Sequence, residues 1–294
     1  MEFRNIDNWK TIMKKIAKEK NLDVQDVQQR FVLEEFAEKI GASEYSDILI
    51  FKGGFVVSTL LGLDTRMTRD LDVTCNSILY DEEQVRDILL TITMTPINSF
   101  FVYSLISIKQ AQKNDRNSGF TAIVQASHDT THIKLKLDIS NNTLIFPEAI
   151  NNSLGSLFFS KSIQVMTYPI ENIIAEKFET TLDRGEFNTR MRDLFDVYLL
   201  MKEHENMIDK NLLAQTIMIV SKDRDTSDNL EEFDEIIDFL MDSSIFNENF
   251  RRYKEKQYPL LKVTLDDILE QFRKIYEMVV TYEQKDTSYV QVND

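Results

Sequence analysis

The N-terminal part of the chain contains segments with the hydrophobic pattern of amphipathic helices. Apolar side chains recur every three or four positions over residues 5–20 and again over residues 24–41, which gathers them on one face of each helix. A further helix is predicted over residues 81–90, because the side chain of Asp81 can cap its first turn. We expect the first two helices to brace a sheet formed by the segments between and after them.

Strand-like segments alternate with these helices. Residues 48–51 are a short apolar run, which is typical of a buried strand. Residues 120–127 and 132–140 predict a hairpin, because both have strand-like patterns and a polar turn joins them. Residues 100–109 are rich in apolar, β-branched and aromatic side chains, so their pattern fits either a helix or a strand. Proline, asparagine and glycine then punctuate residues 141–162, which indicates an irregular connection.

From Pro169 onward, long helical repeats replace the strand-like pattern. Two helices separated by a break at residues 185–188 are predicted first, over residues 169–200, and three more follow over residues 211–220, 230–241 and 265–282. The chain is therefore predicted to be an α+β protein with two domains. We expect a mixed-sheet domain at residues 1–160 and an α-helical bundle domain at residues 161–294.

The composition excludes several classes of protein. Of the 294 residues, 43% are hydrophobic, which is enough for a sizeable core. The single cysteine, Cys75, excludes a disulfide framework and a cysteine-based zinc site. The N-terminal segment lacks the apolar core of a signal peptide, and no run approaches the roughly 18 apolar residues of a membrane span. We therefore expect a soluble, cytoplasmic protein with no membrane partner.

The charge is strongly negative and unevenly distributed. A formal net charge of −15 at pH 7 disfavours broad, non-specific adhesion to nucleic acid. Any RNA substrate would therefore have to be recognised by a local basic surface. Residues 223–248 contain ten acidic side chains and one basic side chain, Arg224. Such a run is usually a solvated helix face, and it would also suit a basic partner.

Residues 48–74 combine three features in a fixed order. The apolar run is followed by Gly53-Gly54, then by a predicted helix over residues 55–63, then by Asp70 and Asp72. Paired glycines let the backbone approach a phosphate closely, and the N-terminus of the following helix attracts an anion. Two aspartates two positions apart on a strand point to one face and suit Mg²⁺, which carboxylates and substrate phosphates hold together. Each feature alone is common, but their order indicates a site for a nucleoside triphosphate.

A third carboxylate lies on a later predicted strand. Within residues 132–140, apolar positions alternate with Lys134, Lys136 and Asp138, so these three side chains share one face. Asp138 can then serve as a further metal ligand or as the base for an attacking hydroxyl. Alternatively, it pairs with one of the two lysines and has no catalytic role.

Two blocks of sequence carry a resemblance to a known family. The order Lys52-Gly53-Gly54, then Arg66-x-Thr68-x-Asp70-Leu71-Asp72, resembles the signature of the nucleotidyltransferase superfamily, and specifically its AbiEii/AbiGii toxin branch. The second block is Ala175-Glu176-Lys177-Phe178, then Arg184, then Arg190-x-Arg192-Asp193-x-x-Asp196-Val197. The resemblance implies a nucleotidyltransferase-like mixed β-sheet domain, with the helical domain contributing the second half of the site.

The resemblance also implies a role for each matching residue. Asp70 and Asp72 would hold Mg²⁺ and act in catalysis, Lys177 would contact the triphosphate, and Asp193 would be an essential acid. The residues expected to contact nucleotide or support its site are Lys52, Gly53, Gly54, Arg66, Thr68, Arg184, Arg192 and Asp196. Lysine and arginine both suit phosphate oxygens. Without the upstream block, the charged residues of the second block would be interpreted as ion pairs on a helix surface.

The expected reaction is transfer of a nucleoside monophosphate from an NTP to an acceptor hydroxyl, with release of pyrophosphate. The resemblance further implies a bacterial toxin of a type IV toxin–antitoxin or abortive phage infection system. A cognate antitoxin would be its partner, and the 3′ end of tRNA its acceptor. Two alternatives remain open, namely nucleotidylation of a protein hydroxyl and a non-catalytic NTP-binding module.

Overall fold

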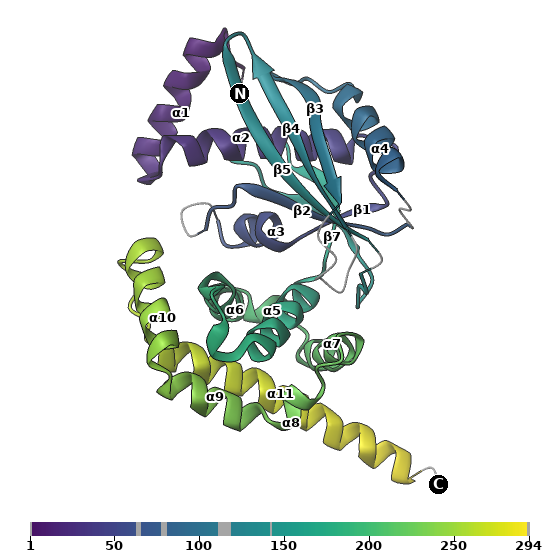
Figure 1. Ribbon diagram of the computed structural model, residues 1–294, viewed down its shortest axis with the longest axis vertical. Coiled ribbons are helices and arrows are strands. Elements are labelled where there is room, and N and C mark those ends of the chain that lie inside the picture. The colour runs from purple at the N-terminus through teal and green to yellow at the C-terminus, as the bar shows by residue number, and fades with distance from the viewer. Residues whose placement is uncertain (1, 63–65, 78–80, 111–118, 142, 293–294) are drawn as a thin grey trace. The chain divides into compact units, whose positions relative to one another are not determined.

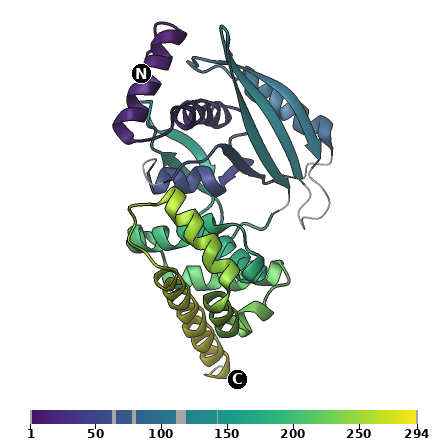
Figure 2. The same ribbon diagram turned by 60° about the vertical axis from the view of Figure 1, so that its left-hand side comes forward.

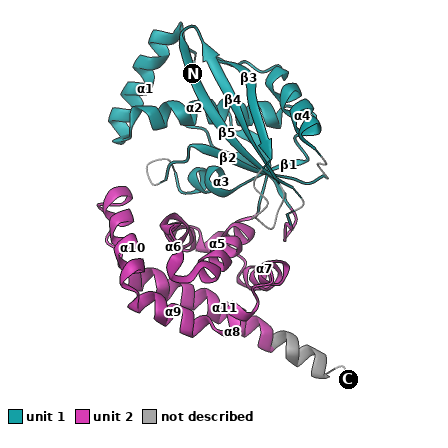
Figure 3. Cartoon of the chain, viewed as in Figure 1, with its two compact units in different colours: residues 1–143, 149–168 teal, residues 144–148, 169–294 magenta. Residues whose placement is uncertain are grey.

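The computed structural model describes residues 2–62, 66–77, 81–110, 119–141 and 143–292. The chain divides into two compact units, which Figure 3 shows in different colours. Unit 1 comprises Met1–Thr143 and Ala149–Tyr168, and unit 2 comprises Leu144–Glu148 and Pro169–Asp294. The described strands all belong to unit 1, whereas the described part of unit 2 is helical apart from its connections.

Unit 1 is built on a seven-stranded sheet with the order β3-β4-β5-β2-β1-β7-β6. The strands are β1 (Leu49–Lys52), β2 (Asp70–Cys75), β3 (Val102–Gln110), β4 (Gly119–His128), β5 (Thr131–Asn141), β6 (Ile150–Leu154) and β7 (Ile163–Thr167). β2 pairs with β5 and β1 pairs with β7 in parallel, and the other neighbours are antiparallel. This mixed sheet, combined with many helices, confirms the predicted α+β fold class.

Two parts of the sheet differ from the pattern-based expectation. Residues 100–109, which fit either a helix or a strand, form most of β3, and Tyr103 and Ile108 turn into the core. The irregular connection predicted over residues 141–162 is wrong in part, because it contains β6. The sequence of β6, INNSL, has little intrinsic preference for a strand. Its extended conformation comes instead from antiparallel pairing with β7.

Among the described residues, unit 1 has the helices α1 (Ile6–Lys20), α2 (Val24–Gly41), α3 (Gly53–Leu60) and α4 (Glu82–Met94). The side chains of Asn5, Asp23 and Asp81 accept hydrogen bonds from N–H groups in the first turns of α1, α2 and α4. α3 begins at Gly53 and ends at Leu60, whereas the predicted helix ran from residue 55 to residue 63, which itself lies outside the described residues. α2 is buried nearly all round rather than on one stripe, because it packs against the sheet, α1 and α4.

Aromatic rings anchor α1 and α2 to the start of β3. Trp9 meets Phe31 and Phe101 edge to face, with ring centroids 5.7 and 5.2 Å apart. Phe158, from the segment between β6 and β7, packs against Phe31 at 5.1 Å. All four side chains are buried. Since each large aromatic ring removes roughly 150–250 Å² of surface from water, this cluster is a main source of stability for unit 1.

Polar groups are also buried beneath α2, and they connect it to α3. Arg30 is 1% exposed and donates to Glu34 at 2.7 Å. It also donates to Ser58 and Thr59 of α3 at 2.6 and 2.9 Å. Its guanidinium lies 4.4 Å from the centroid of the Phe55 ring. Because α3 begins at the paired glycines, this network fixes the helix on which the glycine turn depends.

Unit 2 contains α5 (Ile170–Arg184), α6 (Met191–Glu203), α7 (Lys210–Asp223), α8 (Asp228–Glu231), α9 (Phe233–Asp242), α10 (Ser244–Gln257) and α11 (Leu265–Val292), with the 3₁₀ turns η1 (Gly185–Phe187) and η2 (Glu205–Met207). Figures 1 and 2 show α11 as the longest of these helices. Its Phe272 stacks on Phe178 of α5 at 5.2 Å, which joins two distant segments in one core. The pattern did not predict α10, whose buried side chains are only Phe246 and Phe250.

The buried pair of Arg30 and Glu34 gives a stability prediction. Arg30→Ala leaves Glu34 buried without its cation, so we expect the free energy of unfolding of unit 1 to fall by about 3–5 kcal/mol. Trp9, the chain's single tryptophan, is fully buried in unit 1, so its fluorescence during urea unfolding reports on this unit. Arg86→Ala is the matched control, because its pair with Glu82 is about half exposed and worth at most ~1 kcal/mol. Equal losses in both variants would contradict the prediction.

Candidate active site

The glycine turn and the aspartate strand meet directly in unit 1. Gly53 starts α3 with a φ of +59°, a left-handed conformation that favours glycine. A Cβ at this position would lie 2.5 Å from Oδ2 of Asp72. The same oxygen accepts a hydrogen bond from the N–H of Gly54 at 3.3 Å. The turn therefore packs directly against an aspartate carboxylate, and its contact with a phosphate stays a prediction.

Arg66 and Thr68 support this turn from the inside. The side chains are 5% and 4% exposed, and Arg66 Nη1 donates to the carbonyl oxygen of Gly54 at 2.8 Å. A Cβ on Gly54 would lie 2.7 Å from Thr68 Oγ1 and 2.9 Å from Arg66 Nη1. The sequence predicted both residues as nucleotide contacts. In the structure they fill the space that the absence of a side chain at Gly54 leaves open, and their contact with nucleotide stays a prediction.

Three carboxylates gather on neighbouring strands. Asp70 and Asp72 lie two residues apart on β2 and share a face, as predicted. Asp138 of β5 is the direct partner of Asp72 in the parallel register, and Lys52 of β1 is its partner on the other side. Lys52, Asp72 and Asp138 thus form one row across three strands, with Asp70 one row further along. The geometry brings the predicted third acid to the predicted pair.

Asp138 also forms the ion pair with a lysine that we expected if it has no catalytic role. Lys136 Nζ donates to its Oδ2 at 2.5 Å, and Thr121 Oγ1 donates to its Oδ1 at 2.7 Å. The hydrogen bond to Asp138 raises the pKa of Lys136, and the charges of Asp138, Asp70 and Asp72 raise it further. Lys136 therefore supplies positive charge to the whole carboxylate group. Thr121 was not predicted, because only the register of β4 on β5 reveals its contact.

The electrostatics of Asp72 fit a bound cation. Burial raises the pKa of this carboxyl group, and the charges of Asp138 and Asp70 raise it further, while the Gly54 N–H and Lys52 act in the opposite direction. A desolvated carboxylate beside two others is stabilised by a divalent cation with oxygen preference. Among the described residues, the side chains do not form a ready-made group of three or more metal ligands. The oxygen donors of Asp70 and Asp72 nevertheless suit such an ion, with the glycine turn packed against one of them.

The second sequence block lies in unit 2 and forms a buried ion cluster. Lys177 of α5 forms ion pairs with both Asp193 and Asp196 of α6, the latter at 2.9 Å. Lys177 and Asp193 are 12% and 14% exposed, and Asp196 is fully buried. These pairs join two helices, so they are not the exposed pairs within one helix that the alternative interpretation assumed. Arg192, by contrast, is exposed, and Arg184 is half-buried.

A neighbouring network on α5 was not predicted from the sequence. Arg224, at the end of α7, donates to Glu176 at 2.9 Å and to Glu179 at 2.5 Å. Thr226 Oγ1 donates to Glu179 at 2.9 Å. These bonds fix the face of α5 that adjoins Lys177. Arg224 is the single basic residue of the acidic stretch at residues 223–248. This isolation was the one feature of the sequence that could have pointed to the network.

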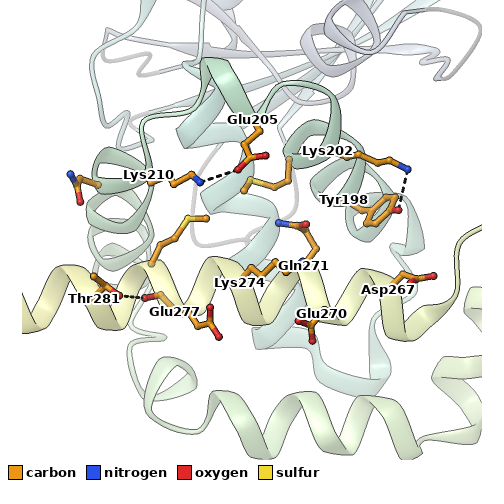
Figure 4. Close-up of a pocket in the computed structure, with 13 residues that line it drawn as sticks. Tyr198, Lys202, Glu205, Lys210, Asp267, Glu270, Gln271, Lys274, Glu277 and Thr281 are labelled. Carbon is orange, nitrogen blue, oxygen red and sulfur yellow. Dashed lines mark hydrogen bonds and ion pairs between the residues drawn. The ribbon is translucent and has the colours of Figure 1, made fainter.

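A hollow of about 840 Å³ lies elsewhere in unit 2, along α6, α7 and α11 (Figure 4). None of the predicted site residues lines it. Three lysines and four acidic side chains line it, and Lys210 and Glu205 form an ion pair across 2.9 Å. Lys202 and Tyr198 are also hydrogen bonded there, at 3.4 Å. The charges are thus largely balanced, and the hollow has no excess of positive charge that would attract the phosphates of a nucleotide.

Comparison of the chain with known proteins identifies similar sequences and structures. The model of the family described as "Nucleotidyl transferase AbiEii toxin, Type IV TA system" matches residues 36–277. A crystal structure from H. pylori, assigned as a nucleotidyltransferase, aligns with a TM-score of 0.50 at 17% identity, covering 90% of this chain and 98% of that one. The crystal structure of JHP933 from Helicobacter pylori aligns with a TM-score of 0.47 at 18% identity, covering 93% and 100%. No curated protein sequence matches the chain.

The family match covers both sequence blocks and most of the chain, and the similarity to the first H. pylori structure concerns the fold. Within the described residues, the helices lack the combination of length and apolarity that a membrane crossing needs. The glycine turn, the paired aspartates and the lysine cluster all lie inside the matched range. The chain therefore belongs to the AbiEii toxin family of type IV toxin–antitoxin systems and is a nucleotidyltransferase.

Proposed function

We propose that the protein transfers a nucleoside monophosphate from an NTP to the 3′ end of tRNA in a Mg²⁺-dependent reaction. The observation that carries this proposal is the carboxylate group of Asp70, Asp72 and Asp138 packed against the Gly53 turn. Such a group concentrates negative charge that Lys52 and Lys136 offset only in part and that a bound divalent cation would offset further. A triphosphate brought with Mg²⁺ has matching chemistry.

In the proposed reaction, an acceptor hydroxyl attacks the α-phosphorus of the NTP. A new O–P bond forms, the bond from the α-phosphorus to the bridging oxygen breaks, and pyrophosphate leaves. Asp70 and Asp72 would hold Mg²⁺, which neutralises charge on the phosphates when bound. Asp138 would take the hydroxyl proton or act as a further ligand. Both oxygens of Asp138 accept hydrogen bonds, from Thr121 and Lys136, which orients the carboxylate.

The residues of the second block complete the proposal. Lys177 would contact the triphosphate, with Asp193 as an essential acid and Asp196 as its support. The two ion pairs of Lys177 favour a fixed position for its ammonium group, since one partner is fully buried. Lys52 would contact phosphate from unit 1. It ends β1 beside Asp72, and its ammonium lies 5.6 Å from the centroid of the Tyr168 ring.

Membership of the family implies an NTP substrate and an antitoxin partner. We propose further that the system acts in phage defence through abortive infection. The proposed substrates, NTPs and tRNA, meet in the cytoplasm, so we expect the protein to act there.

Labelling of RNA tests the proposed reaction. Purified protein is incubated with Mg²⁺, total bacterial RNA and each α-³²P-labelled NTP in turn. We expect label on RNA of tRNA size with the wild type, and a loss of at least about a hundredfold in Asp72→Asn, because this variant removes a charged metal ligand. Asp129→Asn is the matched control. Asp129 is an exposed aspartate of unit 1 with a φ of +49°, which asparagine also adopts.

Three outcomes would redirect the proposal. Label on protein that survives RNase treatment would identify a protein hydroxyl as the acceptor. Binding of NTP without any release of pyrophosphate would indicate a non-catalytic module. Equal labelling by the wild type and by Asp72→Asn would remove the paired aspartates from the mechanism.

The raised pKa of Asp72 predicts a pH-dependent stability. Because the folded state favours the protonated form, ionisation costs stability as the pH rises from the unfolded-state pKa of about 3.9 through the higher folded-state value. Asparagine has no proton to lose, so Asp72→Asn is expected to be more stable than the wild type near neutral pH without metal. The difference should vanish as the pH falls below about 4. Urea unfolding followed by Trp9 fluorescence measures it.

Addition of Mg²⁺ should reverse this order. A cation present at a concentration of a hundred times its Kd stabilises the folded state by about 2.7 kcal/mol. Asp72→Asn lacks one of the groups proposed to bind this cation. We expect the wild type to gain stability in MgCl₂ and Asp72→Asn to gain much less. Equal gains in both proteins would show that Asp72 does not hold the ion.

The proposed role of Lys177 is separable from its structural one. Lys177→Arg keeps a positive charge beside Asp193 and Asp196, so we expect thermal unfolding followed by circular dichroism to change little. The guanidinium is larger and forked, so contact with the triphosphate should be disturbed and kcat/KM for the NTP should fall about tenfold or more. Lys210→Arg, in the exposed pair with Glu205, is the control. An unchanged kcat/KM would argue for a purely structural Lys177.

A further inference from the structure

In the described part of unit 1, the helices that pack on β3 and β5 lie on one face of the sheet and leave its other face open. α2 packs against β5 and α4 packs against β3, and in Figure 1 α2 passes behind the strands β3, β4 and β5 while α4 is seen beside β3. Tyr103 of β3 points to that covered side, where its hydroxyl donates to Glu35 of α2 at 2.9 Å. The neighbouring positions therefore point to the opposite, open side. Val102, next to Tyr103, is 74% exposed.

The strand register gives the side chains of this open face. In one row, Lys109 of β3, Thr121 of β4 and Asp138 of β5 are direct neighbours, and the row continues to Asp72. Two rows further along lie Ser104, Gln125 and Lys134. Side chains in register across adjacent strands point to the same face. The open face is thus continuous with the carboxylate group proposed as the catalytic centre.

The charge of this face is opposite to that of the chain. The net charge of the protein is −15, yet the open positions described on β3, β4 and β5 include Lys109, Lys134 and Lys136 and a single acid, Asp138. Asp138 is itself paired with Lys136. Lys109 and Lys134 are exposed. Beyond the carboxylate end, the other open positions are serine, glutamine, histidine and aliphatic side chains, which add no negative charge.

We propose that the open face of β3, β4 and β5 binds a single-stranded RNA acceptor, with Lys109 and Lys134 on its phosphates. The claim that the RNA ends at Asp70 and Asp72 rests on the function proposed above. Lys134 and Asp138 are four residues apart on β5, which is about 13 Å along a strand. A short stretch of RNA backbone therefore spans the distance from the exposed lysine to the carboxylate group.

The composition of the face also indicates how the RNA is recognised. The open positions described on β3, β4 and β5 lack the phenylalanine, tyrosine and tryptophan side chains on which bases stack, and their one aromatic group is the imidazole of His132. Binding should therefore depend on the phosphate backbone, tolerate sequence changes and weaken steeply with salt. A protein partner would not require this salt dependence.

Charge reversal tests the proposal. The probe is a fluorescein-labelled single-stranded RNA of about 20 nucleotides, and its binding is measured by anisotropy over a range of salt concentrations. We expect Lys109→Glu/Lys134→Glu to raise the Kd by about tenfold or more and to reduce the slope of log K against log salt by about 1.4, because two phosphate contacts are lost. Binding of a fluorescent NTP should not change.

The matched control is Lys14→Glu/Lys18→Glu. Both lysines are exposed on α1, which packs on α2 and lies outside the open face, and the double variant carries the same change in charge. An equal loss of RNA affinity in both double variants, or no loss in either, would overturn the proposal. If Trp9 fluorescence shows that charge reversal unfolds unit 1, Lys109→Gln/Lys134→Gln replaces it.

The labelling assay separates this proposal from the proposed function. If charge reversal weakens RNA binding but the wild type labels no RNA, the open face stands and transfer to RNA fails. If the wild type labels RNA and Lys109→Glu/Lys134→Glu binds and labels it equally well, transfer stands and the open face fails.

Discussion

The carboxylate of Asp72 occupies the space that a side chain at position 53 would need, and much of unit 1 is arranged around this contact. A Cβ on Gly53 would come within 2.5 Å of Oδ2, so the turn from β1 to α3 closes onto β2 only with glycine there. Gly54 makes the second half of the contact through its N–H. Arg66 and Thr68 fill the space behind Gly54, and Arg30 fixes α3 to α2. The position of one carboxylate is thus determined by residues from four segments of the chain.

This arrangement places a desolvated negative charge beside two others. Burial and the neighbouring aspartates both disfavour ionisation of Asp72, so the site is less stable with its carboxylate charged than a neutral site would be. Lys52 and Lys136 reduce the repulsion among the aspartates, but they do so whether or not substrate is bound. A cation that arrives with the substrate relieves the remainder only when substrate is present. The same electrostatic cost that lowers stability therefore favours the complex with metal and nucleotide.

The sequence correctly predicted those features that depend on interactions between neighbouring residues in the chain. The cap at Asp81, the alternation along β5 and the glycine break before Asn188 each depend on a few adjacent residues, and the structure contains them. Contacts that depend on topology could not be predicted in this way. Asp72 and Asp138 are neighbours because β2 and β5 pair in parallel, and no pattern within either segment specifies that pairing. The burial of Arg66 and the contact between Lys177 and Asp196 likewise depend on packing between separate elements. In both cases the residue types pointed to phosphate, whereas their immediate partners are protein groups.

The net charge of −15 does not conflict with an RNA-binding face, because electrostatic reach in solution is short. At physiological ionic strength the Debye length is about 8 Å, so an exposed phosphate responds mainly to charges within one or two side-chain lengths. Among the described open positions near Lys109 and Lys134 those charges are positive, and the acid closest to them in the register, Asp138, is paired with Lys136. The acids of residues 223–248 then matter chiefly at low salt, where their field extends further and opposes the approach of RNA. An acidic protein can in this way avoid indiscriminate adhesion to nucleic acid and still bind RNA where lysines gather on one face of its sheet.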